Sequence, residues 1–357
     1  MARRLLIPFS CIALSIAVSI SARAVSYRIV DLGTFGGISA SASSVNSSGQ
    51  IVGSFTNSTG EKHAFLYTPS SGMTDLGTFG GLEAEARDIN DSGQIAINVR
   101  MQSVSRTYIR DTIGSLIDVG SLGGGSASSQ AINNLGQVVG NSGDFAFLYT
   151  PGSGMANILP AYPSYAVDIS DTGYIAGGFL SGGPGAFVRS PDGTLSFLHF
   201  EPIGDNSYSV YAVNAAGVGV GRHRWYDKLQ GLSVWEGMIW PPPSGTGIHL
   251  PSNSYHTSPA DINDDGWIVG HSTHIAGSDY AFLTGPGIGT VELPTLGGVA
   301  PHPLHIDNTG MIAGYAQTAS GETHAVYWEQ VVPEPSGILC LSAGGLGLLL
   351  AFRRRKT

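Results

Sequence analysis

The sequence has little cysteine and little charge, and both shortages restrict its fold. Its 357 residues include only two cysteines, Cys11 and Cys340, so the long stretch between them can form no internal disulfide. Charged residues make up 12% of the chain against about 25% in an average globular domain, whereas 42% of the residues are hydrophobic. This composition excludes an intrinsically disordered protein. The fold must be stabilised by a large hydrophobic core.

Basic residues are especially scarce between the two ends of the chain. Residues 1–24 and 333–357 hold seven of the 17 lysines and arginines but one of the 26 acidic residues, which leaves 10 minus 25, or −15, between them. Such a surface repels phosphate backbones and argues against nucleic acid as a partner. Glycine, in contrast, is abundant at 51 residues. That disfavours helices and favours short strands joined by tight turns.

Both ends of the chain have the composition of targeting segments. Arg3 and Arg4 precede an apolar run, and Ala22-Arg23-Ala24 has the small residues that signal peptidase requires, so residues 1–24 are predicted to be a signal peptide cleaved after Ala24. Residues 337–352 form a second apolar stretch, predicted to be a short transmembrane helix whose basic flank stays in the cytoplasm. The protein is therefore expected to be exported and held transiently in the inner membrane, with a permanent C-terminal anchor as the alternative.

The residues around the second apolar stretch narrow its role. A Pro-Glu-Pro motif stands before it and an arginine cluster follows it. The motif is Pro333, Glu334 and Pro335, and the cluster is Arg353, Arg354 and Arg355. This order resembles the PEP-CTERM sorting tail of Gram-negative bacteria. The resemblance implies recognition by an exosortase, removal of the helix, and release or attachment at the cell surface, usually in species that make exopolysaccharide.

A segment of the form apolar-Asn-x-x-Gly-x-apolar-x-Gly recurs between the two ends. Its seven copies place their asparagine, or the residue that replaces it, at Asn46, Asn90, Asn133, Ser170, Asn214, Asn263 and Asp307. The copies also carry a small-aromatic-apolar strand such as His63-Ala64-Phe65, and several carry a glycine loop such as Asp31-Leu32-Gly33. These phrases resemble the HAF extracellular repeat family over residues 27–328, although the fourth and fifth copies lack the Asp-Leu-Gly phrase.

Each repeat has room for four short strands. The Asn-x-x-Gly segment forms a tight turn, and four strands in 40 to 45 residues make one blade of a propeller. We therefore predict an all-β fold, a seven-bladed β-propeller over residues 25–332, with an open β-solenoid as the alternative. The chain starts on a strand of the Asp-Leu-Gly type at residues 27–33 and ends after a third strand at Trp328. Residues 27–33 should thus complete the seventh blade and close the ring.

Catalytic motifs are missing from the chain. It contains no Gly-x-Ser-x-Gly, no His-Glu-x-x-His and no phosphate-loop sequence. No catalytic residue and no cofactor is predicted, and the protein is expected not to be an enzyme. Carboxylates contributed by separate blades could still make a polysaccharide hydrolase or lyase, which remains an alternative.

Two patterns raise the question of metals. Asp88–Gly93 and Asp261–Gly266 resemble the start of an EF-hand loop but lack the glutamate at its twelfth position, which leaves at most weak structural calcium. Histidines are paired in neighbouring repeats and can be assembled into a metal site, although free surface imidazoles are the favoured interpretation. The pairs are His271 with His274 and His302 with His305. No metal site is predicted.

The segment after Gly221 is longer than its equivalents and is both basic and aromatic. The candidate ligand-binding residues are Arg222, Arg224, Trp225, Tyr226, Lys228 and Trp235. Such a loop can stack sugar rings and pair with their carboxylates, or its aromatics can simply pack against their own blade. We predict a monomeric cell-surface or matrix protein that binds exopolysaccharide, with signal peptidase and exosortase as partners during export. A purely structural surface protein is the other alternative.

Overall fold

The computed structural model describes residues 25–331 except 182–184, 200–206, 228–230, 244, 251–255, 275–276 and 300. The predicted signal peptide, the sorting motif and the apolar stretch at 337–352 lie outside the described residues. Within the described part, no helix is long and apolar enough to cross a membrane.

The described chain consists of strands and one short 3-10 helix. Its first third contains β1 (Tyr27–Gly33), β2 (Ser39–Val45), β3 (Ile51–Thr56), β4 (Lys62–Thr68), β5 (Gly72–Gly77), β6 (Glu83–Ile89), β7 (Ile95–Arg100), β8 (Ser105–Arg110), β9 (Leu116–Asp118) and the 3-10 helix η1 (Leu122–Gly124). The middle third contains β10 (Ala127–Ile132), β11 (Val138–Ser142), β12 (Phe145–Thr150), β13 (Gly154–Asn157), β14 (Ser164–Ile169), β15 (Ile175–Phe179), β16 (Ala186–Arg189) and β17 (Leu195–Leu198). The last third contains β18 (Ser207–Val213), β19 (Gly219–Asp227), β20 (Leu232–Trp240), β21 (Ile248–His249), β22 (His256–Ile262), β23 (Ile268–Thr273), β24 (Asp279–Gly285), β25 (Ile288–Glu292), β26 (His302–Ile306), β27 (Ile312–Gln317) and β28 (Thr323–Gln330).

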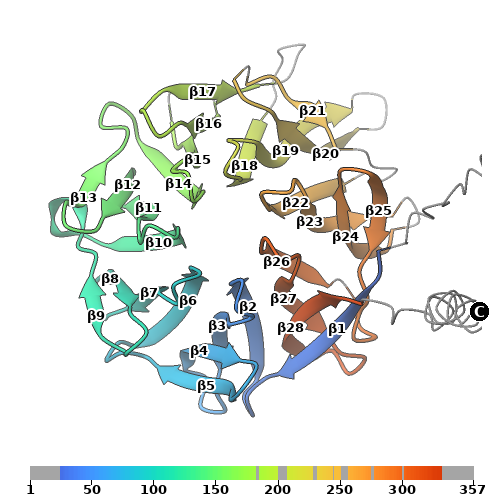
Figure 1. The fold of residues 1–357 in the computed structure, drawn as a ribbon, viewed down its shortest axis with the longest axis horizontal. Coiled ribbons are helices and arrows are strands. Elements are labelled where there is room, and N and C mark those ends of the chain that lie inside the picture. Colours follow the sequence, from blue (N-terminus) through green and yellow to red (C-terminus); the bar gives the residue numbers. More distant parts are fainter. Residues whose placement is uncertain are drawn as a thin grey trace, which may run out of the picture.

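Most of these strands form four-stranded antiparallel sheets of sequence neighbours: β2–β5, β6–β9, β10–β13 and β14–β17. Strands β18–β25 belong to one eight-stranded sheet, whose halves are linked by a single parallel pair, Trp235 with His256. Figure 1 shows the sheets arranged radially, with β2, β6, β10, β14, β18, β22 and β26 nearest the centre. No sheet in the described part closes on itself. The arrangement is that of a β-propeller, so the predicted all-β class is confirmed.

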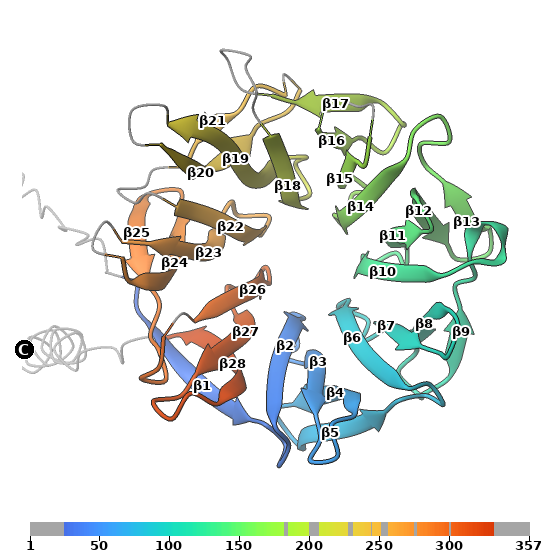
Figure 2. The ribbon, with the colours of Figure 1, turned by 180° about the vertical axis from the view of Figure 1, so that it is seen from behind.

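The first strand pairs with the last one, as predicted for residues 27–33. β1 is the outer strand of the sheet β1-β28-β27-β26 and aligns Tyr27 with Gln330 and Val30 with Tyr327. The N–H of Val331 donates to the carbonyl of Ser26 over 2.8 Å. Figure 2 shows β1 running along the outer edge of the ring beside β28. The pairing covers an edge that β28 would otherwise expose.

The two repeated phrases contact each other in the folded chain. Nδ1 of His63, from the His-Ala-Phe strand, lies 2.9 Å from Asp75 of the neighbouring Asp-Leu-Gly strand. The same pair recurs between His324 and Asp31, also at 2.9 Å, although these residues come from opposite ends of the chain. The two repeated segments therefore form one histidine–aspartate contact across neighbouring strands. The pairing of β1 with β28 forms the same contact between the two ends of the chain.

The second glycine of the motif is required by close packing. A Cβ built on Gly53 lies 2.0 Å from the carbonyl oxygen of Ser41 and 2.8 Å from the ring of Phe65. Because Gly53 has no side chain, β2 can bulge toward β3, and the ring of Phe65 on β4 can pack directly against the backbone of Gly53. Fully buried phenylalanines repeat this arrangement at Phe65, Phe147, Phe187 and Phe282. The core around the ring therefore contains one buried phenylalanine of this kind in each of these four sheets.

The connections between repeats lie on the same face as the hairpins between second and third strands. The N–H of Ile38 donates to the carbonyl of Thr56 at the end of β3, and that of Leu82 donates to Arg100 at the end of β7. We call this side the hairpin face. The Asn-x-x-Gly turns occupy the opposite side, the turn face.

Candidate functional site

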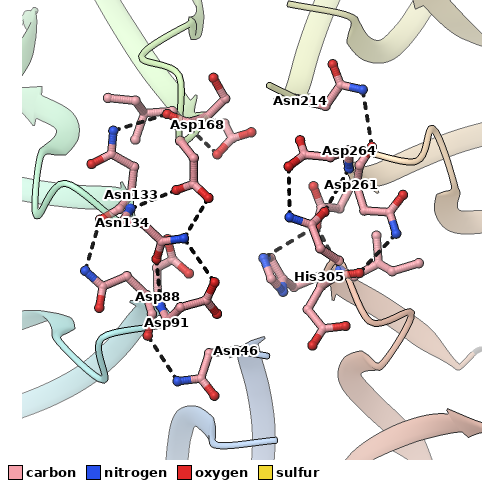
Figure 3. A pocket seen from close by; sticks show the side chains of 18 of the residues that line it. Asn46, Asp88, Asp91, Asn133, Asn134, Asp168, Asn214, Asp261, Asp264 and His305 are labelled. Atoms are coloured by element: carbon pink, nitrogen blue, oxygen red, sulfur yellow. Dashed lines mark hydrogen bonds and ion pairs between the residues drawn. The ribbon is translucent and has the colours of Figure 1, made fainter. Parts of the chain in front are cut away.

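The motif asparagines converge on one end of the central channel, at the turn face (Figure 3). The side-chain amide of Asn46 donates to the carbonyl of Asn90 over 3.0 Å, and Asn90 donates to the carbonyl of Asn133 over 3.0 Å. The same bond is made by Asn133 to Ser170, by Asn214 to Asn263 and by Asn263 to Asp307. Ser170 and Asp307 have no side-chain amide to donate, so the series of bonds is interrupted at these two positions. The asparagines thus link neighbouring repeats in addition to forming turns.

Carboxylates dominate this end of the channel. The opening is a cavity of about 130 Å³. Its ionisable lining residues are Asp88, Asp91, Asp168, Asp171, Asp261, Asp264, Asp307 and His305. Several of these carboxylates accept backbone N–H groups from the preceding repeat; Asp91, for example, accepts the N–H of Ser47 over 2.9 Å. The opening therefore has a negative electrostatic potential that attracts cations and repels anions.

Three aspartates bridge neighbouring repeats deeper in the channel; Asp261 is buried, and Asp88 and Asp168 are half-buried. Asp168 accepts the N–H of Ile169 over 2.8 Å and the N–H of Val213, in the next repeat, over 2.7 Å. Asp88 and Asp261 make the same pair of bonds to Ile89 with Ile132 and to Ile262 with Ile306. Within the described part of the chain, no group of three or more His, Cys, Asp or Glu side chains is placed to hold a metal ion. The calcium-like segments instead use their carboxylates to hold the ring together.

Burial perturbs the acid–base behaviour of these groups. It raises the pKa of Asp168 to about 7, with a smaller contribution from the nearby carboxylate of Asp261 and opposed by the Val213 N–H. Burial likewise raises the pKa of Asp261. For His305, burial alone lowers the pKa, but the surrounding carboxylates, Asp261 first, outweigh it and the pKa is raised. Nδ1 of His305 accepts the N–H of Val45 over 3.4 Å, across the junction of the chain ends.

A second cavity of about 460 Å³ lies further along the channel. Its cations are already compensated, because Lys62 and Arg87 each pair with Glu85 at 2.8 and 2.9 Å. Arg87 also donates to the side chain of Gln130 over 2.8 Å. The channel therefore offers a polar interior without a free positive charge among its described lining residues.

The predicted ligand-binding segment is a strand pair rather than a loop. β19 and β20 have nine residues each, whereas the second strands of the other repeats have five or six. The hairpin places Arg224 opposite Trp235 and Tyr226 opposite Ser233. Lys228 lies outside the described residues. The extra length extends this hairpin beyond its equivalents on the hairpin face.

The structure brings the two predicted arginines onto one tryptophan. The guanidinium carbon of Arg222 lies 3.8 Å from the ring centroid of Trp235, and that of Arg224 lies 5.3 Å from it. Tyr226 is 58% exposed. Trp225 alternates with these residues along β19 and points to the other side of the strand. Because Arg222 already stacks on Trp235, the groups most open to a ligand are Arg224 and Tyr226.

Neither arginine has an acidic partner among the described side chains. Within the described part of the chain, no carboxylate lies within salt-bridge distance of Arg222 or Arg224, and Arg224 donates to the hydroxyl of Ser233 over 3.1 Å. Other cations do form ion pairs: Arg28, Lys62, Arg87, Arg100 and Arg106. Among the described side chains, the hairpin thus presents two positive charges that no carboxylate pairs with.

The four histidines of the two sequence pairs are rearranged by the fold. The rings of His271 and His302 meet with centroids 5.0 Å apart. His274 stacks on Tyr280 at 4.0 Å instead, and His305 lines the channel at the turn face. One histidine of each pair is therefore brought together, and the other two are separated from them.

The chain matches no protein-family model and no curated protein sequence. Solved structures do resemble it. The β-propeller domain of the trilobed protease from Pyrococcus furiosus, described as having an open velcro topology, has a TM-score of 0.57 at 13% identity, over 83% of this chain and 95% of that one. A prolyl endopeptidase has a TM-score of 0.51 at 14% identity over 84% of this chain, and puromycin hydrolase 0.52 at 11% over 86%. This chain spans 51% and 56% of the length of those two.

These similarities establish the propeller fold and correct one expectation. The prediction that the protein is not an enzyme rested on missing catalytic motifs, and it was wrong, because the solved structures that share this fold include peptidases. At 11% to 14% identity the resemblance shows the fold alone. The absence of a sequence motif therefore does not exclude a role in catalysis for this propeller.

Proposed function

We propose that this chain is an exported, seven-bladed β-propeller that binds an acidic polysaccharide through the β19–β20 hairpin. The blade number is supported by the eight-stranded sheet, whose halves β18–β21 and β22–β25 each begin with a copy of the repeat and meet in only one residue pair. Pairing of β1 with β28 supports closure of the ring through the N-terminal strand.

The observation that carries the binding proposal is the pair of uncompensated guanidinium groups of Arg222 and Arg224. A guanidinium can donate two parallel hydrogen bonds to a carboxylate, and stacking on Trp235 holds Arg222 in place before a ligand arrives. The exposed ring of Tyr226 adds an apolar surface on the same side of the strand, suited to a sugar ring. Uronate-containing polymers combine both chemistries.

Export is proposed from the two chain ends. Signal peptidase would cleave after Ala24, and an exosortase would recognise Pro333, Glu334 and Pro335 and release the protein to the cell surface. The bond between Ser26 and Val331 brings the two ends of the described chain together at one outer edge of the ring.

Binding can be tested with the full chain in detergent and immobilised polysaccharides. Arg224→Gln should weaken retention on a polyuronate about tenfold, because one charge-assisted pair is lost, and should leave the melting temperature unchanged. Arg100→Gln is the matched control, since Arg100 ends the equivalent strand β7 but is paired with Glu83. Equal retention on neutral dextran, or no retention of the unmodified protein on any acidic polymer, would refute the proposal. Release of reducing ends in the same mixtures would reveal cleavage of the polymer.

A further inference from the structure

We propose that the hairpin face also carries a carboxylate-binding site between the last three repeats, formed by Arg222, His271 and His302, whose affinity rises as the pH falls. This inference rests on the proposed binding of an acidic polysaccharide. It adds the location of one ligand carboxylate and a pH dependence that the arginines alone cannot produce.

Two of the three residues stand where earlier repeats have an amide that bonds to the next repeat. Oδ1 of Asn98 accepts the N–H of Ser129 over 2.8 Å, and Oδ1 of Asn141 accepts the N–H of Ala166 over 3.2 Å. At the equivalent position, directly after the second glycine of the motif, the later repeats have Arg222 and His271. A neutral linking amide is therefore replaced, in consecutive repeats, by groups that bind anions.

Ring contacts orient the guanidinium group and the two imidazoles. The guanidinium carbon of Arg222 lies between two rings, 3.8 Å from the centroid of Trp235 and 5.6 Å from that of Tyr211. His271 meets His302 edge to face at 5.0 Å. His302 in turn stacks on Tyr315 at 4.7 Å. Stacking fixes the ring planes, and both imidazoles remain partly exposed.

The site lies at the opposite end of the channel from the acidic opening. Arg222 pairs with Ser209 on the inner strand β18, His271 pairs with Ser258 on β22, and His302 is the first residue of β26. These inner strands run from here toward the Asn-x-x-Gly turns. All three side chains are partly exposed. An anion excluded from the turn face can therefore approach them.

Several charged and titratable groups surround the imidazoles. Arg222 on β19 acts on His271, and Asp279 on β24 acts on both imidazoles. The phenol of Tyr315 on β27 stacks on His302, Tyr211 on β18 lies beside Arg222, and His256 starts β22 beside Trp235. The carboxylate of Asp279 accepts the hydroxyl of Thr273 over 2.7 Å. It makes no salt bridge with either imidazole in the described part of the chain.

The electrostatic balance around the imidazoles gives the sign of the pH effect. Burial lowers the pKa of His271 first, and the neighbouring His302 and Arg222 lower it further against the effect of Asp279. Burial also lowers the pKa of His302. Both imidazoles are therefore neutral at pH 7 in the free protein. A bound carboxylate stabilises the protonated form, and by linkage a ligand that favours protonation binds more tightly at lower pH.

The test is the affinity of the full chain, in detergent, for a polyuronate between pH 8 and pH 5.5. Uronate carboxyls have a pKa of about 3.5 and stay ionised throughout, so a change must come from the protein. A rise of one unit in one imidazole pKa corresponds to at most about a tenfold gain in affinity, reached only below the pKa of the free protein, so an increase of about three- to tenfold is expected by pH 5.5. His271→Gln with His302→Gln should keep the affinity measured at pH 8 and lose the increase.

The control variant is His274→Gln, because His274 lies just beyond the end of the same strand but stacks on Tyr280. It should retain the full increase. NMR titration of the unmodified protein, with and without an oligouronate, should show the pKa values of His271 and His302 moving upward, a readout that survives if the double variant fails to fold. A flat pH profile with binding intact overturns this inference but leaves the proposed function standing, whereas no binding at any pH overturns the proposed function.

Discussion

Closure of the ring by β1 should control the stability of the whole propeller, and Tyr27 is the residue through which to test it. Its side chain is only 8% exposed and packs in a cluster with Trp328 and Ile312 of the last sheet. Its hydroxyl donates to the carbonyl of Gly310, in the last Asn-x-x-Gly type turn, over 2.9 Å. Burial, assisted by Asp307, raises the pKa of Tyr27 to about 12.

The magnitude follows from what each substitution removes. Tyr27→Phe leaves the Gly310 carbonyl without its donor and should cost about 1 to 2 kcal/mol. Tyr27→Ala also empties the cavity beside Trp328 and should cost about 3 to 5 kcal/mol. Since a folded domain is stable by about 5 to 15 kcal/mol, the second change removes a large part of the total. At about 2 °C per kcal/mol, the melting temperature should fall by at least about 6 °C.

Urea unfolding followed by tryptophan fluorescence and by far-UV circular dichroism would measure the effect. Both probes should shift together, because the sheets pack against one another around the ring. Tyr226→Ala is the control, since Tyr226 is an exposed tyrosine on a strand and its loss should leave the midpoint unchanged. The reasoning is refuted if Tyr27→Ala leaves the midpoint in place and only exposes Arg28 to proteolysis, because β1 would then be a dispensable addition.

Three further outcomes follow from the packing and charges. Burial raises the pKa of Asp168 from 3.8 to about 7, so the stability that this residue contributes is complete below pH 3.8 and is lost as the pH rises toward 7. In a series of denaturation midpoints from pH 4 to pH 8, Asp168→Asn should reduce the loss of stability with rising pH. Gly53→Ala places a methyl group 2.0 Å from the carbonyl of Ser41 and should lower the free energy of unfolding by about 3 kcal/mol, measured by urea unfolding, and an unchanged midpoint would show that β2 can move away. Asn90→Ala removes one bond to the next repeat and two to Gln94 within its own turn and should cost about 2 kcal/mol in the same assay, whereas no loss would mean that these amides are not structural.

The sequence by itself determined the repeating unit and the pairing of the chain ends. Asn-x-x-Gly and the glycine loops are local signals, because asparagine bonds to its own backbone and glycine accepts positive φ; Gly49 has a φ of 71°. The order of strand types along the chain was enough to predict that residues 27–33 would pair with the strand ending at Trp328. Each of these inferences depends on neighbours in sequence or on the period of the repeat.

Only the tertiary structure decided which side chains meet between repeats. The bond from the Val213 N–H to Asp168 joins residues 45 positions apart and depends on how closely two sheets approach. In the same way, His271 was grouped by sequence with His274, whereas the fold places it against His302. Such contacts are set by the radial packing of the sheets around a common channel. The sequence pattern determines to which side of its strand a side chain points. It does not determine how far that side chain lies from the neighbouring sheet.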